Sequence, residues 1–189
     1  PFQKLGHYEI VGRLGRGGMG DVYKGYERRL DRYVAIKVLP AEFSRQDEMV
    51  RRFNAEASAA AKLVHPNTVE IFFIGEDAAP AAEGQPPSAV HFFAMQFVEG
   101  ESLAELLARR KRLNVDETLA IAEQALAGPA AAHQLGMVHR DIKPGNIMID
   151  RQRQRAVSRD IAQCLIHERP GDRGGLADKD RLRLRREPF

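Results

Sequence analysis

Within the first forty residues, short segments separated by turn-like stretches have the pattern of β-strands, in which side chains alternate between two faces. Just before Pro40, the residues Val34, Ile36 and Val38 alternate with their neighbours in this way. Short turns between such segments predict an antiparallel meander and not a βαβ unit. The pattern predicts three strands, over residues 8–14, 21–26 and 33–39.

The next segment changes to a helical period. Ser44 and Asp47 have the spacing of a capping box, which predicts a helix over residues 45–64, and Pro66 follows its end. Apolar positions three and four residues apart form one face of this helix, made by Val50, Phe53, Ala57, Ala60 and Val64. The segment therefore predicts one long amphipathic helix after the strands.

The middle of the chain predicts two more strands and two more helices. The strands cover residues 69–74 and 90–97, and residues 76–88, which are rich in Ala, Pro and Gly, form a surface loop between them. Ser102 and Glu105 form a second capping signature, which starts a short helix through Arg110. The last predicted helix runs from residue 116 or 117 to 134.

A proline interrupts that last helix. Pro129 removes one helical hydrogen bond and clashes with the carbonyl of Ala125, at a cost of about 3 kcal/mol or more. Either the helix kinks at Gly128 and Pro129 or it begins later than the pattern suggests.

Residues 15–22 spell Gly-Arg-Gly-Gly-Met-Gly-Asp-Val, between two predicted strands. Glycines let the backbone approach phosphate oxygens closely and present its N–H groups to them. The Walker A motif is excluded because Asp21 stands where that motif has Lys, and a dinucleotide fingerprint is disfavoured because the sequence after Val22 stays strand-like. We predict a phosphate-binding loop whose glycines are Gly15, Gly17, Gly18 and Gly20.

One lysine and one carboxylate lie near predicted core positions. Lys37 ends the sequence Val-Ala-Ile-Lys in the third strand. Glu56 lies on or beside the apolar face of the long helix, three residues after Phe53 and four before Ala60. A carboxylate that faces a core is costly unless it is paired. We therefore predict that Lys37 and Glu56 form an ion pair.

Residues 139–148 spell His-Arg-Asp-Ile-Lys-Pro-Gly-Asn-Ile-Met. With the glycine loop and the strand lysine upstream in this order, the chain resembles the eukaryotic-like Ser/Thr protein kinases of bacteria. In protein kinases the loop Asp accepts the proton of the substrate hydroxyl, the Lys neutralises charge at the transferred phosphoryl group, and the Asn ligates Mg²⁺. The resemblance assigns these roles to Asp141, Lys143 and Asn146, with ATP and Mg²⁺ as cofactors and protein Ser or Thr hydroxyls as acceptors.

The resemblance also implies an α+β fold of the protein-kinase type. Residues 7–98 are expected to form a β-rich small lobe, an antiparallel sheet plus one long helix, with the ATP-binding loop and hinge. Residues 99–150 form the start of a helical large lobe with the catalytic loop, and residues 151–189 a poorly ordered basic tail outside the family pattern. In that family the strand lysine, paired with the helix glutamate, holds the nucleotide phosphates, which assigns this role to Lys37 and Glu56. The implied adenine pocket has Leu14, Val22 and Ala35 as roof, Met148 as floor, Met95 before the hinge, and Phe97 with Val98 in the hinge.

The family pattern changes after Asp150. The sequence Asp-Phe-Gly, whose Asp binds Mg²⁺ in kinases, occurs nowhere in the 189 residues, and residues 158–163 read Ser-Arg-Asp-Ile-Ala-Gln instead. Asp160 is the candidate to replace that metal ligand. Ala-Pro-Glu, which closes an activation segment, is also absent. We expect a catalytic domain truncated after the catalytic loop, and a frame disruption near codon 151 is the hypothesis that translation of the neighbouring frames tests.

Charge and cysteine content exclude some classes. The net charge of +3 divides into +5 over residues 151–189 and −2 over the rest, and without aromatic interleaving or a known module it does not predict nucleic-acid binding. The single cysteine, Cys164, excludes an intramolecular disulfide and fits a reducing compartment. With neither a bilayer-spanning apolar run nor a signal peptide, the sequence predicts a cytoplasmic protein without a membrane segment.

Two alternative functions stay open at this point. The first is an inactive kinase remnant that acts as a nucleotide-binding or protein-interaction fragment, because the metal-binding Asp and the lower large lobe are missing. The second is a nicotinamide oxidoreductase, which rests on the glycine motif alone.

Overall fold

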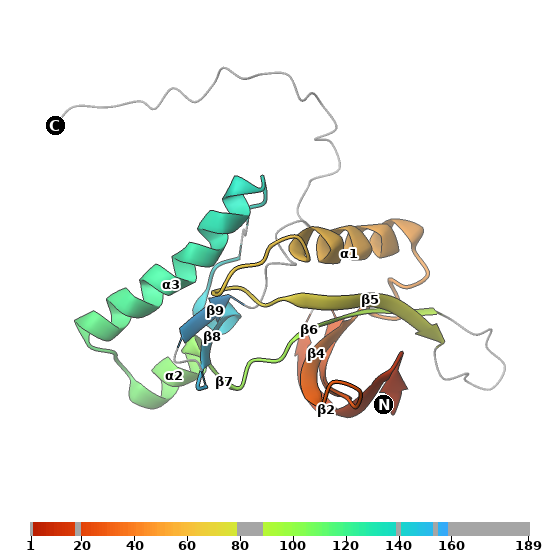
Figure 1. Cartoon of the computed structure of the whole chain (residues 1–189), viewed down its shortest axis with the longest axis horizontal. Coiled ribbons are helices and arrows are strands. Elements are labelled where there is room, and N and C mark those ends of the chain that lie inside the picture. Colours follow the sequence, from red (N-terminus) through yellow and green to blue (C-terminus); the bar gives the residue numbers. More distant parts are fainter. Residues whose placement is uncertain (1, 18–19, 79–88, 139–140, 153–154, 159–189) are drawn as a thin grey trace, which may run out of the picture.

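The computed structural model describes residues 2–17, 20–78, 89–138, 141–152 and 155–158. Its larger sheet has six antiparallel strands in the order β1-β2-β3-β4-β6-β5 (Figure 1). In that order the strands are Lys4–Leu5, Tyr8–Gly17, Gly20–Glu27, Arg32–Val38, Ala89–Gln96 and Ile71–Ala78. The predicted antiparallel meander is confirmed, and β5 continues through residues 76–78, which the sequence placed in a loop.

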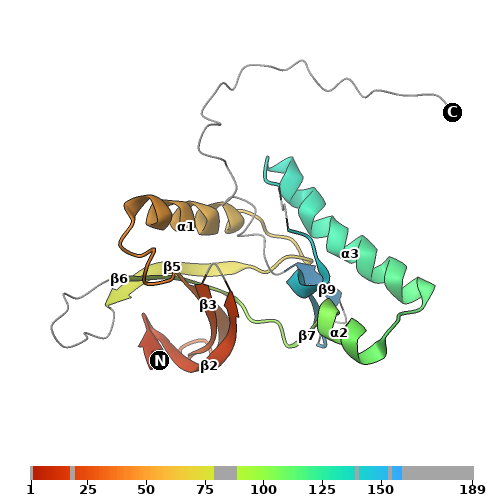
Figure 2. The same ribbon diagram turned by 180° about the vertical axis from the view of Figure 1, so that it is seen from behind.

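Alternate residues of β4 belong to two different cores. Val34 and Ile36 pack with Phe92 of β6 on one face of the sheet. Ala35, and Leu39 directly after the strand, pack on the other face, against helix α1 (Asp47–Ala60). Figures 1 and 2 show α1 lying along this face of the sheet. The period-two pattern of the sequence therefore predicted which face each side chain takes.

Helix α1 is shorter than predicted at both ends. It begins at Asp47, and its N-cap residue Gln46 makes no side-chain cap. The hydroxyl of Ser44 donates to the carbonyl of Pro40 at 3.2 Å instead, so the predicted capping box at Ser44 is wrong. The helix ends at Ala60, and Val64, which the pattern placed on the apolar face, is 79% exposed.

The second half of the described chain combines a small sheet with two helices. The sheet has the order β7-β8-β9, and the helices α2 and α3 lie beside it (Figures 1 and 2). The capping box of Ser102 and Glu105 at the start of α2 is confirmed, and a second box that the sequence analysis missed caps α3 through Asn114 and Glu117. The elements are β7 (Gly100–Ser102), α2 (Leu103–Arg110), α3 (Val115–Gln134), a 3-10 turn η1 (Pro144–Asn146), β8 (Ile147–Asp150) and β9 (Arg155–Ser158).

Helix α3 begins at Val115 and continues through Pro129, so the alternative that it begins later than the pattern suggests is wrong. A glycine is needed at position 128, because α3 packs very closely against residues 67–68 at this point. A Cβ atom built on Gly128 lies 2.7 Å from Cγ2 of Thr68 and 2.9 Å from the carbonyl oxygen of Asn67. The glycine therefore sets the distance between α3 and this connection.

Strand β9 contradicts part of the expected tail. Residues 155–158 pair with β8 in antiparallel register, with Ile147 opposite Ser158 and Asp150 opposite Arg155. Ala156 and Val157 are buried, at 2% and 0% exposure. The expectation of a poorly ordered segment from residue 151 onward is thus wrong for these four residues, because their apolar side chains complete a core.

Candidate functional site

Three side chains of the predicted catalytic loop meet at one carboxylate. The Nζ atom of Lys143 lies 2.7 Å from Oδ2 of Asp141. Nδ2 of Asn146 donates to the same oxygen at 2.8 Å and to the main-chain carbonyl of Asp141 at 3.0 Å. The structure therefore brings together the three residues that the sequence predicted as catalytic. His139 and Arg140 of the motif lie outside the described residues.

A short turn holds these side chains in place. Pro144 begins η1, where its fixed φ suits the first turn, and the N–H of Asn146 donates to the carbonyl of Lys143 at 2.9 Å. Asn146 is 5% exposed, whereas the Lys143 and Asp141 side chains are 56% and 39% exposed. A buried asparagine thus anchors the solvent-exposed carboxylate of Asp141, and that carboxylate in turn binds the Lys143 ammonium group.

Lys37 and Glu56 are both buried on the side of the sheet that α1 covers. Their exposed fractions are 7% and 3%. Nζ of Lys37 lies 5.9 Å from the centroid of the Phe93 ring, and that ring contacts Phe53, one turn before Glu56 on α1, with centroids 5.1 Å apart. Lys37 therefore points toward the helix that carries Glu56, and their ion pair stays a prediction.

The glycine-rich segment joins β2 and β3 as a hairpin. Gly15 lies opposite Val22, and Gly17 opposite Gly20. Gly20 has φ of +120°, and a Cβ atom built on it lies 2.1 Å from the carbonyl oxygen of Val38, so only glycine fits there. Gly18 lies outside the described residues. The hairpin leaves the space around Gly15 open, since a Cβ atom there meets nothing within 4 Å.

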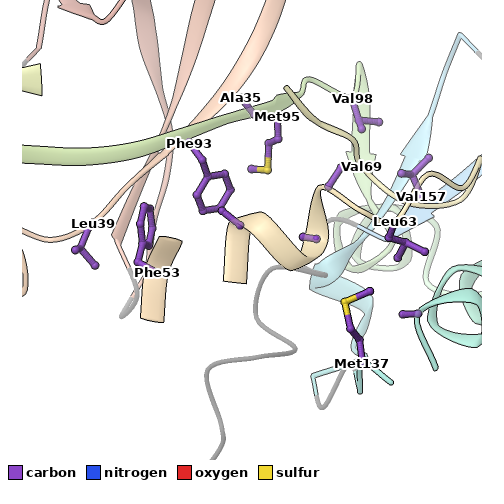
Figure 3. Close-up of a cluster of buried hydrophobic side chains, with 13 residues drawn as sticks. Ala35, Leu39, Phe53, Leu63, Val69, Phe93, Met95, Val98, Met137 and Val157 are labelled. Carbon is purple, nitrogen blue, oxygen red and sulfur yellow. The ribbon is translucent and has the colours of Figure 1, made fainter. Parts of the chain in front are cut away.

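Six of the seven predicted adenine-pocket residues lie in or against one hydrophobic cluster. Ala35, Met95 and Val98 are buried members (Figure 3), and Val22, Phe97 and Met148 are partly buried and packed against it. Ala35 lies directly opposite Met95 in the β4–β6 pairing. Leu14 is 48% exposed and does not belong to the cluster. We call Phe97 and Val98 the hinge pair.

The sequence analysis missed the contacts that connect the two halves, which we call the α3–β9 junction: Asn67, Gln124, Gly128, Ala156 and Ser158. Nδ2 of Asn67 donates to the carbonyl of Ala156 at 2.8 Å, and the N–H of Ala156 donates to Oε1 of Gln124 at 2.9 Å. The N–H of Ser158 donates to the Asn67 carbonyl at 2.8 Å. The sequence around Asn67 signalled only a helix stop, because its hydrogen-bond partners Ala156 and Ser158 are 89 or more residues away.

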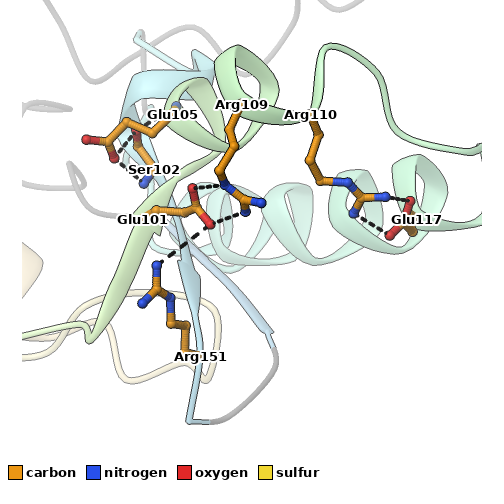
Figure 4. Close-up of polar contacts among 7 residues, drawn as sticks. All are labelled: Glu101, Ser102, Glu105, Arg109, Arg110, Glu117 and Arg151. Carbon is orange, nitrogen blue, oxygen red and sulfur yellow. Dashed lines mark hydrogen bonds and ion pairs between the residues drawn. The ribbon is translucent and has the colours of Figure 1, made fainter.

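A charged network covers the outside of α2 (Figure 4). Arg109 donates to Glu101 at 2.6 Å, and Arg110 donates to Glu117 at 2.7 Å. These hydrogen bonds lower the pKa of Glu101 and of Glu117 below the usual value. They fasten α2 to β7 and to the first turn of α3, next to the chain that leaves the hinge pair.

The donors for a divalent cation are partly in place. Nδ2 of Asn146 donates to Asp141, which leaves its amide oxygen as a hard ligand of the kind that Mg²⁺ prefers. Among the residues that the structure describes, no group of three or more His, Cys, Asp or Glu gathers at one point. Asp160 and Cys164 lie outside the described residues. The asparagine fits a metal role, and the second ligand stays a prediction.

The comparisons with known proteins all point to one family. A model of the protein kinase domain matches residues 8–161. The match continues past residue 151, so the expected change to non-family sequence near that position is not supported. The chain is 41% identical over 145 residues to the serine/threonine-protein kinase PrkC of Bacillus subtilis, a match that covers 77% of this chain and 21% of that protein.

Another relative and a solved structure show the same similarity. The serine/threonine-protein kinase PknA of Mycobacterium tuberculosis is 40% identical over 144 residues, covering 76% of this chain and 32% of PknA. The crystal structure of the Mycobacterium tuberculosis PknI kinase domain superposes with a TM-score of 0.67 at 32% identity, over 84% of this chain and 61% of that one. The chain therefore spans about a fifth to a third of these curated relatives.

Proposed function

The chain belongs to the protein kinase family, and we propose that it transfers the γ-phosphoryl group of Mg-ATP to Ser or Thr hydroxyls of proteins. The observation that carries this proposal is the arrangement at Asp141, where Lys143 and Asn146 bond the same carboxylate oxygen at 2.7 and 2.8 Å. An asparagine that orients the carboxylate and a lysine beside it are the groups that positioned phosphoryl transfer requires.

In this proposal Asp141 orients the acceptor hydroxyl and takes its proton. Its carboxylate is part-exposed, so a protein substrate can reach it. Lys143 offsets negative charge on the transferred phosphoryl group, because its ammonium lies 2.7 Å from the Asp141 carboxylate that binds the acceptor hydroxyl. Asn146 holds the carboxylate in place from its buried side. The lysine also favours Ser or Thr over Tyr as acceptor, by family resemblance.

ATP would bind between the glycine-rich hairpin and the catalytic loop. The hairpin glycines allow close approach of phosphates, and Lys37, oriented by an ion pair with Glu56, would hold the α- and β-phosphates from the buried side of the sheet. The hydrophobic cluster around Ala35 and Met95 would enclose the adenine. Magnesium supplies charge neutralisation at the phosphates, and Asn146 is the residue described here that would ligate it.

Replacing the Asp141 carboxylate by an amide of the same shape tests the proposal. Asp141→Asn keeps the shape of the side chain and removes the base, so we expect transfer of labelled phosphate from ATP to a generic basic protein to fall by about 10²- to 10⁴-fold. ATP-dependent thermal stabilisation should remain. Asp116→Asn, at an exposed position in the first turn of α3, is the matched control and should transfer normally. Equal transfer by the Asp141 variant and the control would contradict the proposal.

An inactive nucleotide-binding remnant is the second candidate. One observation favours it: the sequence has no Asp-Phe-Gly, and β9 leads into Arg159, Asp160 and Ile161 instead. ATP-dependent stabilisation without phosphate transfer by the wild-type chain would support the remnant. If ATP produces neither stabilisation nor phosphate transfer, both functions are excluded, and only the role of a protein-interaction fragment is left.

The location of the protein and its lack of nucleic-acid partners stay predictions. No helix within the described ranges has the length and apolar character needed to span a bilayer. The cytoplasmic location and the absence of nucleic-acid partners rest on the sequence arguments alone. Cell fractionation of the full-length protein tests the first.

A further inference from the structure

Lys24 of β3 lies between two aromatic rings. Its Nζ atom is 3.9 Å from the centroid of the Tyr33 ring and 4.5 Å from that of Phe97. The two rings contact each other, with centroids 6.3 Å apart and planes inclined by 62°. Both Nζ distances lie within the range of cation–π attraction, about 6 Å. Among the described residues, Lys24 has no carboxylate partner, so the rings are what hold its ammonium group.

Strand register places this group beside the predicted adenine pocket. Val22 and Lys24 are alternate residues of β3 and share one face of the sheet, and Val22 packs against the pocket cluster. Lys24 lies opposite Ala35 of β4, which lies opposite Met95 of β6. The ammonium group of Lys24 therefore lies beside Phe97, the first residue after β6 and the first of the hinge pair.

The main chain is fixed immediately before and after the hinge pair. The N–H of Gln96 donates to the carbonyl of Glu70 at 2.8 Å, and the N–H of Arg151 donates to the carbonyl of Glu99 at 2.9 Å. Within the described part of the chain, none of the main-chain hydrogen bonds that connect elements uses a peptide group of the hinge pair. The side chains of the pair therefore constrain these peptide groups: Val98 is buried in the hydrophobic cluster, and Phe97 contacts Tyr33 and Lys24.

We propose that Lys24 is a positioning residue for adenine recognition. By binding the rings of Phe97 and Tyr33 it fixes the Phe97 side chain, and with it the N–H and C=O groups that the hinge pair offers to the base. The inference rests on the proposed binding of ATP and adds a residue that the kinase motifs do not contain. Because Lys24 lies at the base end of the site, it affects the adenine and not the triphosphate.

Lys24→Met tests this, because it keeps the length of the side chain and removes its charge. We expect a calorimetric dissociation constant for Mg-ATP that is about fivefold higher, equivalent to about 1 kcal/mol. The affinity for inorganic tripolyphosphate with Mg²⁺ should not change, and amide hydrogen exchange at residues 97 and 98 should become faster. Lys24→Arg keeps a cation that stacks on rings and should restore ATP affinity to within about twofold.

Lys4→Met, an exposed lysine on β1 of the same sheet, is the matched control and should behave as wild type. Unchanged ATP affinity in Lys24→Met, or an equal loss for ATP and tripolyphosphate, would overturn the inference. If the wild-type chain binds no ATP, the proposed function fails and hydrogen exchange decides alone. Faster exchange at the hinge pair in Lys24→Met then supports the positioning role, and equal exchange overturns it.

Discussion

The six-stranded sheet and helix α3 bury their apolar side chains to very different extents. In the sheet, Phe92 and Phe93 point to opposite faces and are 0% and 1% exposed, because each face has its own hydrophobic cluster. In α3, by contrast, Val115, Leu119 and Leu126 are 58–73% exposed. The sheet therefore buries side chains on both of its faces, whereas α3 buries side chains on one side only.

The buried side of α3 explains the difference. Its four buried residues are all small, namely Ala125, Gly128, Pro129 and Ala132. Small residues contribute little apolar area but allow backbones to approach closely, which is what the α3–β9 junction uses for its hydrogen bonds. The sheet half is thus stabilised by buried area, and the α3 half by close approach and polar contacts. The consequence is that substitutions of the same kind should have unequal effects in the two regions.

The largest effect is expected in the sheet. Phe92→Ala removes a fully buried ring and should lower the free energy of unfolding by about 3–5 kcal/mol. Urea unfolding followed by circular dichroism measures this. Phe73→Ala is the matched control, since Phe73 packs on Phe92 with centroids 6.0 Å apart but is 39% exposed. A loss for Phe92→Ala no larger than for Phe73→Ala would contradict the picture of a two-faced core.

A smaller but still clear loss is expected at the junction. Gly128→Ala improves helix propensity by about 1 kcal/mol, yet its Cβ atom would lie 2.7 Å from Thr68 and 2.9 Å from the Asn67 carbonyl. We expect a net destabilisation of about 1–3 kcal/mol by the same unfolding measurement. Adding Thr68→Ser removes the methyl group and keeps the hydroxyl that donates to His65, so it should restore part of the loss. A stabilised Gly128→Ala variant would show that close approach is not required.

The exposed side of α3 should tolerate polar substitution. Leu119→Gln removes a side chain that is 63% exposed, so the free energy of unfolding should change by less than about 0.5 kcal/mol. Light scattering should show less self-association, because the exposed apolar face shrinks. Leu106→Gln, on α2 and 8% exposed, is the control and should be strongly destabilising. Equal losses at the two leucines would mean that the exposed side of α3 is covered in solution.

The sequence predicted the sheet well because its signal is local. The alternation around Val34 and Ile36 fixed both the strand and its faces, and Ser102 with Glu105 formed the predicted capping box. The prediction from sequence failed at Ser44, whose hydroxyl donates to the carbonyl of Pro40 and does not cap a helix. The spacing of Ser44 and Asp47 does not decide whether the hydroxyl accepts from a helix N–H or, as here, donates to a nearby carbonyl.

The candidate site was predictable where the motif is contiguous and less so where it depends on tertiary contact. Asp141, Lys143 and Asn146 lie within six residues, and their convergence is confirmed. The role of residues 155–158 was missed because β9 is held by Asn67 and Gln124, which lie far away in sequence. Only the fold brings such partners together, so no local pattern contains them.

The smallest effect is expected in the charged network on α2, where side chains are solvent-exposed. The hydrogen bond from Arg109 lowers the pKa of Glu101 below 4.5 in the folded protein. A lowered folded-state pKa means that the pair stabilises the protein above the unfolded-state pKa, and that this stabilisation is lost as the pH falls through the folded-state pKa. Glu101→Gln should therefore melt slightly below wild type at pH 7, and the gap should close as the pH falls below 4.5.

Glu123→Gln on α3, for which the described residues provide no ion pair, is the control and should leave melting unchanged at pH 7. High salt should also close the Glu101 gap, because exposed pairs are screened; a gap that persists in salt and acid would show that Glu101 acts through packing and not through its charge.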